Sequence, residues 1–341
     1  MINRWEGIIR TAVSGSSSPA RVMASVVLKP NSDTLLEPSK NAILFMGDSV
    51  RDSGNPVIER LSKLETVSSI ILCKLGDPFA NVWVVEAPRF SGPFACYEGF
   101  LSSMSPCGDP LSYDPLKYPA STAITTMLHG CLAQIRLMCA EMNREDGGQQ
   151  VDKKNENQQE LRKDPQVSLP QTLLFGFSKG GVVLNQLLSE LSFAFRSMQN
   201  HGRERTMERH ESNQSPRPQE VICPATSEGF LSSIVEVHFL DVGLNCRGAY
   251  QTNVDVLEGV VAGAGTANEY LRLGFHGTPR QWSDPYRHWI ADEKDFCISF
   301  LRKKADEKGN AKFRTTEKLY FEHTRPSLQM HFEILESFEM F

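Results

Sequence analysis

A serine between glycines is the residue of this sequence best suited to nucleophilic chemistry. Ser178 lies at the centre of Gly176-Phe177-Ser178-Lys179-Gly180, a Gly-x-Ser-x-Gly pattern. The glycines two residues before and after the serine lack Cβ atoms, so a strand and a helix can pass close together. The turn between them strains the serine backbone and lifts its hydroxyl out of the sheet. The pattern predicts a nucleophile elbow, and a plain glycine-rich strand-to-helix turn is the alternative.

A serine hydroxyl needs a base that takes its proton and an acid that orients the base. In the α/β-hydrolase arrangement the chain order is serine, acid, histidine, with each residue just beyond the end of a strand. Ser178, Asp241 and His276 occur in this order, and each directly follows an apolar, strand-like run. We therefore predict a triad of these three residues. Asp255, inside an expected helix, is an alternative acid, and His288, ahead of another helix, is an alternative base.

The oxyanion that forms during acyl transfer needs preorganised backbone N–H donors. We expect one donor from Lys179 and one from the turn Gly47-Asp48, which follows a short apolar run. A carboxylate at Asp48 would oppose the developing negative charge unless it points away or is paired. The Lys179 ammonium is a candidate partner for it, and solvation of that ammonium is the alternative. This turn also lacks the glycine-rich HGGG-type sequence found in many lipases and esterases.

Apolar runs that alternate with amphipathic segments must position these residues. Strands are expected at 21–29, 41–46, 82–87, 172–175, 233–240 and 268–275, and helices at 56–64, 121–142, 182–195, 254–261 and 288–304. Such alternation indicates a mostly parallel central sheet with helices on both faces. The expected fold class is therefore α/β, in an α/β-hydrolase-like form. The segments 318–321 and 330–334 are expected to add a strand or to pack against the domain.

Composition along the chain predicts its domain organisation. Residues 1–20 are expected to be a disordered or targeting N-terminus, and 21–341 a single α/β-hydrolase-like domain. Polar, low-complexity stretches predict disordered insertions near 144–166 and 199–228. The long loop 88–120 is rich in aromatic residues, which indicates that it packs over the domain and forms part of an acyl pocket.

Composition also limits the partners of the chain. The 341 residues carry a formal net charge of −5, and no concentrated basic face indicates a nucleic-acid partner. No apolar run reaches the roughly 18 to 20 residues of a membrane span, so no transmembrane segment is expected. The eight cysteines form neither a CxxC motif nor a zinc-binding spacing, which indicates reduced thiols in a protein that is not secreted. No metal or organic cofactor is expected, and a protein partner stays open.

These landmarks resemble an uncharacterised α/β-hydrolase-like family of eukaryotes whose vertebrate member is mitochondrial. The resemblance covers roughly residue 40 to the C-terminus, without the two insertions. It rests on Gly47-Asp48, the elbow segment 175–188, Leu240-Asp241, His276 with Thr278-Pro279, Asp284-Pro285, Trp289-Ile290 and His331-Phe332. It implies a serine-hydrolase-like fold, a mitochondrial address, and Ser178, Asp241 and His276 as catalytic candidates. His288 does not belong to the matched pattern.

Two functions are compatible with these residues. The first is a serine hydrolase acting on an ester or thioester of a lipid or small metabolite, with Ser178 as nucleophile, His276 as proton relay and Asp241 as orienting acid. The second is a non-catalytic interaction or scaffold protein that retains the hydrolase fold, and Asp48 beside the expected oxyanion hole favours it. A cytoplasmic location is the alternative to the mitochondrial one.

Overall fold

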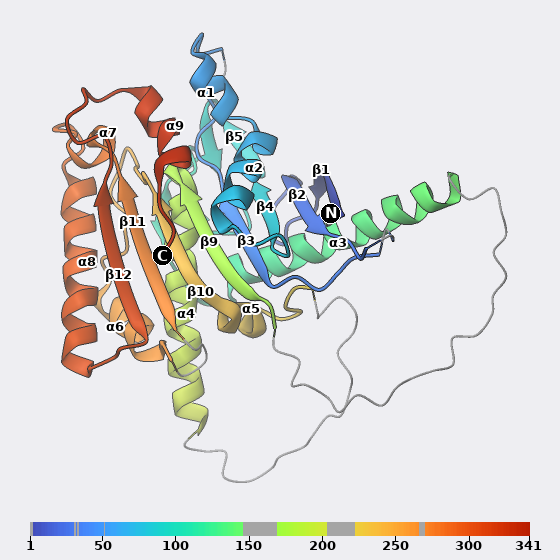
Figure 1. The fold of residues 1–341 in the computed structure, drawn as a ribbon. Helices are drawn as coiled ribbons and strands as arrows, with labels where there is room; N and C mark the ends of the chain where they lie inside the picture. The colour runs from blue at the N-terminus through green and yellow to red at the C-terminus, as the bar shows by residue number, and fades with distance from the viewer. Residues whose placement is uncertain are drawn as a thin grey trace.

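The computed structural model of the protein describes residues 3–30, 32, 34–50, 52–145, 169–202, 222–265 and 270–341. An eight-stranded sheet is the centre of this described part (Figure 1). Its strands, in spatial order, are β1 (Arg4–Thr11), β2 (Ala20–Val27), β4 (Asn81–Val85), β3 (Lys40–Phe45), β9 (Gln171–Phe177), β10 (Ile234–Leu240), β11 (Leu271–Gly277) and β12 (Phe313–Leu319). Strand β2 is antiparallel to both of its neighbours, and every other neighbouring pair is parallel.

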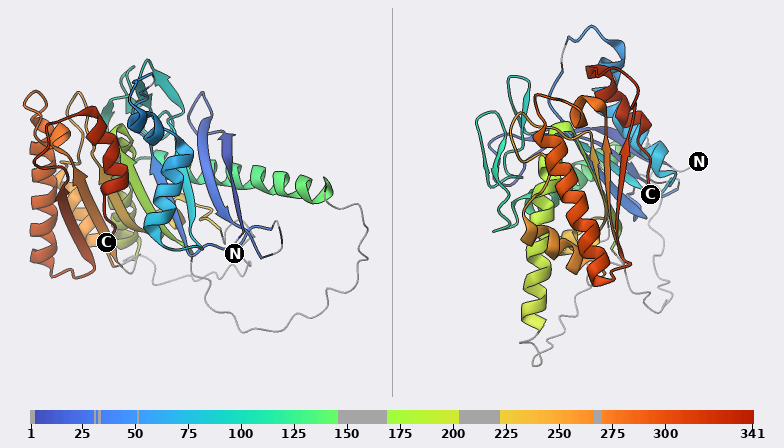
Figure 2. Two further views of the ribbon diagram at one scale, coloured as in Figure 1. Left: turned by 45° about the horizontal axis from the view of Figure 1, so that its top comes forward. Right: turned by 90° about the vertical axis from the view of Figure 1, so that its left-hand side faces the viewer.

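Helices cover both faces of this sheet. One face carries α3 (Pro119–Glu145), α4 (Gly181–Gly202), α5 (Ser227–Ser233), α6 (Val254–Gly263) and α8 (Trp289–Lys308). The other carries α1 (Pro56–Leu61), α2 (Leu64–Leu75) and α9 (Leu328–Ser337). The right-hand view of Figure 2 shows the two helix layers on opposite sides of the strands. The predicted α/β-hydrolase-like fold class, with a mostly parallel sheet covered on both faces, is confirmed.

The apolar strands form because both of their faces are buried. In β3, Ile43 and Phe45 face the core under α3 and α4, whereas Ala42 and Leu44 face the core under α1, α2 and α9. Alternate side chains of a strand point to opposite faces. A parallel strand buried on both sides therefore reads as a continuous apolar run in the sequence, and this is why the central strands were predictable.

The N-terminal segment differs from expectation. The prediction that residues 1–20 are disordered is wrong for the described residues, because Arg4–Thr11 is strand β1 and pairs with β2 over its whole length. Ile9 and Thr11 are buried. The Arg4 guanidinium donates to the Ser25 carbonyl at 2.8 Å and to the Ala80 carbonyl at 2.8 Å. The charged and polar residues of β1 belong to an edge strand whose outer face is solvated, and for this reason the sequence did not indicate a strand there.

The expected insertions lie mostly outside the described residues, which omit 146–168 and 203–221. Their expected boundaries are nevertheless too wide at one end. Ile222 and Cys223 are buried, and the Ile222 carbonyl accepts a hydrogen bond from the Asn41 side chain at 2.8 Å. Helix α5 then begins at Ser227. The domain therefore resumes several residues before position 228.

The loop 88–120 packs on the domain as two short hairpins, β5 (Arg89–Ser91) with β6 (Phe94–Cys96) and β7 (Ser103–Met104) with β8 (Pro110–Ser112). Tyr97 and Phe100 are fully buried and make edge contacts with Phe45 of β3. The Tyr97 hydroxyl also donates to the Met46 carbonyl. The aromatic residues of this loop therefore secure it to the sheet.

Helix α3 is the one described helix whose length and apolar composition, over Pro119–Glu141, would suffice to cross a membrane. Half of its most apolar window is buried inside the domain. Ala123, Met127 and Cys131 are fully buried there, and the helix packs on β1, α4 and α5. Burial against the rest of the domain accounts for its composition as that of a core helix.

Candidate functional site

The serine turn has the predicted strand-turn-helix geometry. Ser178 follows β9 directly, opens the short 3₁₀ turn η1 (Ser178–Gly180), and has a φ of 53°, in the left-handed region that L-residues rarely adopt. A Cβ at Gly180 would lie 2.1 Å from the Phe45 carbonyl oxygen, and one at Gly176 would lie 2.8 Å from the Gly181 Cα. The two glycines are therefore required where strand and helix meet, and the strain falls on the serine.

The turn after β3 lies directly against this serine. A Cβ at Gly47 would lie 2.4 Å from the Ser178 Cβ and 2.9 Å from its Oγ. The backbone N–H groups of Gly47 and Asp48 have no hydrogen-bond acceptor in the described part of the chain, whereas the next N–H, of Ser49, donates to the Pro93 carbonyl. The N–H of Lys179 begins the turn that leads into α4, where N–H groups lack intrahelical partners. The expected oxyanion donors are therefore close to the serine.

Asp241 follows the end of β10, as predicted, and its carboxylate is completely buried. One carboxylate oxygen accepts the Thr278 N–H at 2.6 Å. The other accepts the Thr278 hydroxyl at 2.9 Å and lies 2.7 Å from Nδ1 of His331. The carboxylate of Asp241 is thus held in one orientation and contacts a histidine that the sequence analysis did not select.

His331 lies in the first turn of α9, whose start is capped by the Ser327 hydroxyl accepting the Met330 N–H at 3.2 Å. Its ring stacks on Phe177, the residue before the nucleophile, with ring centroids 4.7 Å apart. The contact with Asp241 occupies Nδ1 and leaves Nε2 for another partner. The capped helix and the aromatic contact together fix this ring.

His276 lies elsewhere, contrary to the predicted pairing with Asp241. Strand β11 continues through Gly277, since β12 pairs with it as far as Leu319, so His276 lies inside the strand and not beyond it. Its backbone carbonyl accepts the Asp241 N–H at 2.7 Å, but its side chain is directed to a different group of residues. There it contacts His238 Nδ1 and the Tyr320 hydroxyl, each at 3.1 Å.

His276 and His238 form a second histidine cluster, separate from His331, and both residues are buried. Burial lowers the pKa of His276 well below its usual value, and the neighbouring His238 acts in the same direction. Burial also lowers the pKa of His238, although Glu236 opposes the change. Both rings are therefore neutral members of the core at neutral pH.

The two alternatives to the predicted acid and base lie on the surface. Asp255 is exposed in the first turn of α6. His288 is exposed at the start of α8, with its ring against Trp289. Neither lines the pocket that contains Ser178.

A pocket of about 220 Å³ opens at Ser178 and His331. Its walls come from the turns after β3 and β10, from α7 (Pro279–Trp282) and from the start of α9. The lining residues are Asp48, Val50, Asp109, Ser178, Lys179, Gly243, Leu244, Asn245, Arg280, Gln281, Arg287, Leu328, His331 and Phe332. Loop 88–120, which is expected to form part of an acyl pocket, contributes Asp109 to this wall, and none of its aromatic residues lines it.

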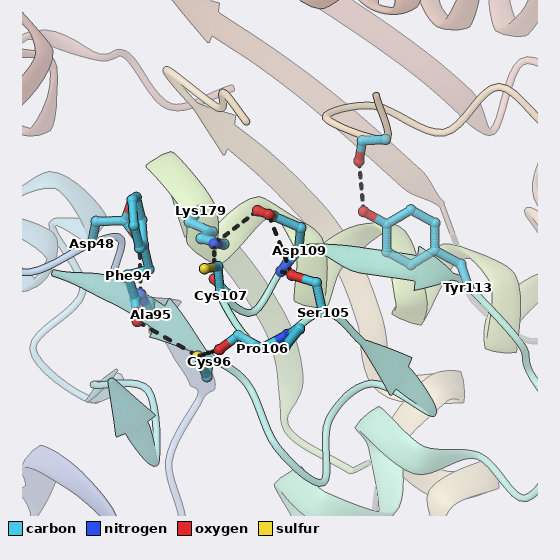
Figure 3. A network of polar contacts seen from close by, with 11 residues as sticks. Asp48, Phe94, Ala95, Cys96, Ser105, Pro106, Cys107, Asp109, Tyr113 and Lys179 are labelled. Atoms are coloured by element: carbon cyan, nitrogen blue, oxygen red, sulfur yellow. Dashed lines mark hydrogen bonds and ion pairs between the residues drawn. The ribbon is translucent and has the colours of Figure 1, made fainter. Parts of the chain in front are cut away.

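Lys179 and Asp48 do not pair with each other. The Lys179 ammonium lies 2.9 Å from Asp109 Oδ1, donates to the Cys107 carbonyl at 2.5 Å, and faces the Phe94 ring (Figure 3). Asp48 Oδ1 instead accepts the Ala95 N–H at 2.8 Å. Burial raises the pKa of the Asp48 carboxyl above its usual value, and the Ala95 N–H opposes the change. Asp48 is therefore held by a backbone donor, and Lys179 ties the loop 105–109 to the elbow.

No group of three or more His, Cys, Asp or Glu side chains able to hold a metal ion occurs within the described ranges. All eight cysteines fall in those ranges, and none of them forms a disulfide there.

Comparison with known proteins identifies sequence relatives. A family model described as C2orf69 matches residues 120–305, more than half of the chain. The mouse (Mus musculus) mitochondrial protein C2orf69 homolog is 27% identical over 365 residues, which cover 96% of this chain and 86% of the mouse protein. The human (Homo sapiens) mitochondrial protein C2orf69 is 29% identical over 169 residues, covering 48% of this chain and 33% of the human protein.

Solved structures with a similar fold are hydrolases. The siderophore hydrolase EstA from Aspergillus nidulans matches 98% of this chain and 92% of its own, with 12% identity and a TM-score of 0.41. The S-formylglutathione hydrolase FrmB from Staphylococcus aureus matches 99% of this chain and 95% of its own, with 10% identity and a TM-score of 0.37. At such low values these similarities carry no information on substrate.

Proposed function

The chain belongs to the C2orf69 family, and we propose that it is a serine hydrolase whose triad is Ser178, His331 and Asp241. The contact between the Asp241 carboxylate and His331 Nδ1, 2.7 Å long and buried, is the observation that carries this proposal. Ser178, in its strained turn, lines the same pocket as His331. The chain order of serine, acid and histidine is that of the α/β-hydrolase arrangement. His331 thus replaces His276 in the base role.

The three side chains would act as follows. Asp241 accepts a hydrogen bond from the Nδ1–H of His331, so Nε2 is the unprotonated nitrogen that takes the Ser178 proton. The serine oxygen then bonds to the acyl carbon, and His331 returns the proton to the departing alcohol or thiol as the acyl–oxygen or acyl–sulfur bond breaks. Water, activated by the same histidine, releases the acid from the serine. The Lys179 N–H and an N–H of the turn Gly47-Asp48 would stabilise the oxyanion.

The pocket supports a small substrate. Its volume of about 220 Å³ is below the ~300–1,000 Å³ that drug-sized ligands occupy. Its wall carries Asp48, Asp109, Lys179, Arg280 and Arg287, so only part of it is apolar. We therefore propose an ester or thioester of a small metabolite in place of a long-chain lipid.

A mitochondrial location is also proposed, since both sequence relatives are named mitochondrial proteins. Subcellular fractionation of the full-length chain with a C-terminal tag tests this, and recovery outside mitochondria would contradict it. Retention of β1 in the mature protein is expected, because Arg4–Thr11 pairs with β2.

Labelling with a fluorophosphonate probe tests the nucleophile. Wild type should be labelled and Ser178→Ala should not, because the probe forms a covalent bond only with an activated serine. Ser189→Ala is the matched control, since Ser189 is a buried serine of α4 that lies outside the pocket. A wild-type protein that is folded and yet unlabelled would refute a working nucleophile and favour the scaffold function.

A further inference from the structure

The short helix α7 supplies two polar side chains to the pocket wall. Arg280 and Gln281 belong to it, and both line the pocket that contains Ser178 and His331. Two residues before Arg280, Thr278 donates both its backbone N–H and its hydroxyl to the Asp241 carboxylate. The position of α7 relative to the proposed triad is thereby fixed.

The cations of the pocket wall differ in whether they have a counterion. Lys179 is paired with Asp109 at 2.9 Å. Arg287 is paired with Asp284 at 2.8 Å. In the part of the chain that the structure describes, the Arg280 guanidinium has neither an ion pair nor a hydrogen bond. Burial lowers the pKa of Arg280 and the neighbouring Arg287 acts in the same direction, while the Asp241 and Asp284 carboxylates oppose the change.

Gln281 is the second side chain without a partner. It is 5% exposed, and its Oε1 is buried with no hydrogen-bond donor among the described residues. The side chain lies flat on Gly243, where a Cβ would be 2.2 Å from Oε1. Leaving a buried amide oxygen without a donor is unfavourable. Stabilisation of the fold therefore does not explain the burial of Gln281.

We propose that Arg280 and Gln281 bind an anionic group, a carboxylate or a phosphate, of the molecule whose ester or thioester Ser178 attacks. A guanidinium offers two parallel N–H donors that match the oxygens of either anion. The NH₂ group of Gln281 adds a donor beside it, while the buried Oε1, which is an acceptor, gains no partner from the anion. The anion would supply the counterion that Arg280 lacks. This inference rests on the proposed function for the reaction, although the anion site itself can be tested without turnover.

The substrate class follows from the position of this site. A pocket of about 220 Å³ places the anion within a few bonds of the acyl carbon. The substrate is thus a short acyl ester or thioester that carries a carboxylate on its acyl chain or a phosphate on its leaving group. A neutral ester of equal size would leave Arg280 unpaired and would bind more weakly.

Two measurements on the full chain test the site. The first is the rise in melting temperature with glutarate, with inorganic phosphate, and with neutral glutaramide as the matched compound. The second is protection of Ser178 from the fluorophosphonate probe by the same compounds. Both are made on wild type, Arg280→Gln, Arg280→Lys and, as a matched control, Arg314→Gln, an exposed residue of β12 outside the pocket.

We expect an anion to stabilise and protect wild type and Arg314→Gln, and glutaramide to do neither. The dissociation constant of the anion should rise about tenfold or more in Arg280→Gln, because a hydrogen bond to a charged group contributes about that factor. Arg280→Lys should fall between the two, and the better of glutarate and phosphate identifies the anion. Equal effects of the anion on wild type and Arg280→Gln, or none on wild type, would overturn the inference. Anion binding that depends on Arg280 in a protein the probe fails to label would leave the site standing and refute the hydrolase.

Discussion

Asp241→Asn separates the proposed triad from a merely structural contact, because the substitution changes one atom of a fully bonded carboxylate. The Thr278 N–H, 2.6 Å from one carboxylate oxygen, is a fixed donor, so the amide oxygen of an asparagine must stay there. The NH₂ group then occupies the site that faces His331 Nδ1 at 2.7 Å. An NH₂ group donates, so His331 must present a bare Nδ1 and carry its proton on Nε2. That tautomer cannot take a proton from Ser178.

The size of the effect follows from this change. Loss of the correct tautomer in a serine, histidine and aspartate triad lowers the rate about 10⁴-fold. Each factor of ten corresponds to 1.36 kcal/mol, so the barrier rises by about 5.4 kcal/mol. Stability should change far less, because the Thr278 N–H bond is kept and the Thr278 hydroxyl can rotate.

The assay is the initial rate of fluorophosphonate labelling at excess probe, with thermal unfolding as the folding check. Asp255→Asn is the matched control, since Asp255 is an exposed carboxylate outside the pocket. His331→Gln should be as slow as Asp241→Asn, while His276→Gln should keep the wild-type rate per folded molecule. A labelling rate of folded Asp241→Asn within tenfold of wild type would refute the reasoning, and so would an equal loss in His276→Gln and His331→Gln.

Two further predictions concern the serine turn and the second histidine cluster. Gly47→Ala should abolish labelling, because the new Cβ would lie 2.4 Å from the Ser178 Cβ. Gly229→Ala is the control and should keep labelling, since the nearest atom to its Cβ would be 3.2 Å away. A labelled Gly47→Ala protein would contradict the close contact between Gly47 and Ser178. The free energy of unfolding should fall as the pH drops below about 6.5, the pKa of an unfolded histidine. Burial lowers the pKa of His238 and His276 in the folded state, so the unfolded chain binds more protons, at up to about 1.4 kcal/mol per pH unit for each histidine. Denaturant titrations from pH 7.5 to 5 measure this, and His276→Gln should flatten the dependence; an unchanged slope would show that other groups cause it.

The parts of the fold that could be predicted are those whose sequence carries one strong pattern of apolar residues or glycines. The central strands are buried on both faces, and the elbow requires glycines at fixed positions, so each leaves a clear signal in the sequence. Strand β1 gave a weaker signal, because its outer face is charged and only Ile9 and Thr11 mark the buried one. The hairpins of loop 88–120 were missed for a related reason, since strands of two or three residues leave no periodicity.

His331, the proposed base, was missed because the sequence analysis expected the catalytic histidine just beyond the end of a strand, whereas His331 lies in α9. Position 276 follows an apolar run, but pairing with β12 extends the strand through Gly277 and commits His276 to one face of the sheet. A Cβ at Gly274 would lie 2.7 Å from the His276 ring, so the glycine makes room for that orientation. His331 belongs to a helix, and chain order and its place in the family resemblance, beside Phe332, were its signals. The pairing of Lys179 with Asp109 depends on a loop whose path no local pattern predicts.

The segment from Gly277 to Trp282 links the proposed acid to the proposed anion site. Thr278 holds the Asp241 carboxylate, Arg280 and Gln281 face the pocket, and the Trp282 indole N–H donates to the Tyr250 hydroxyl at 3.0 Å. Gly277 allows the Trp282 ring to fold back, since a Cβ there would lie 2.0 Å from it. Substitutions at positions 277 and 278 would therefore disturb substrate binding and catalysis together. His331 lies on α9 and Arg280 lies on α7, so each can be changed without changing the other element. A loss of activity in a His331 variant can therefore be assigned to catalysis, and a loss in an Arg280 variant to substrate binding.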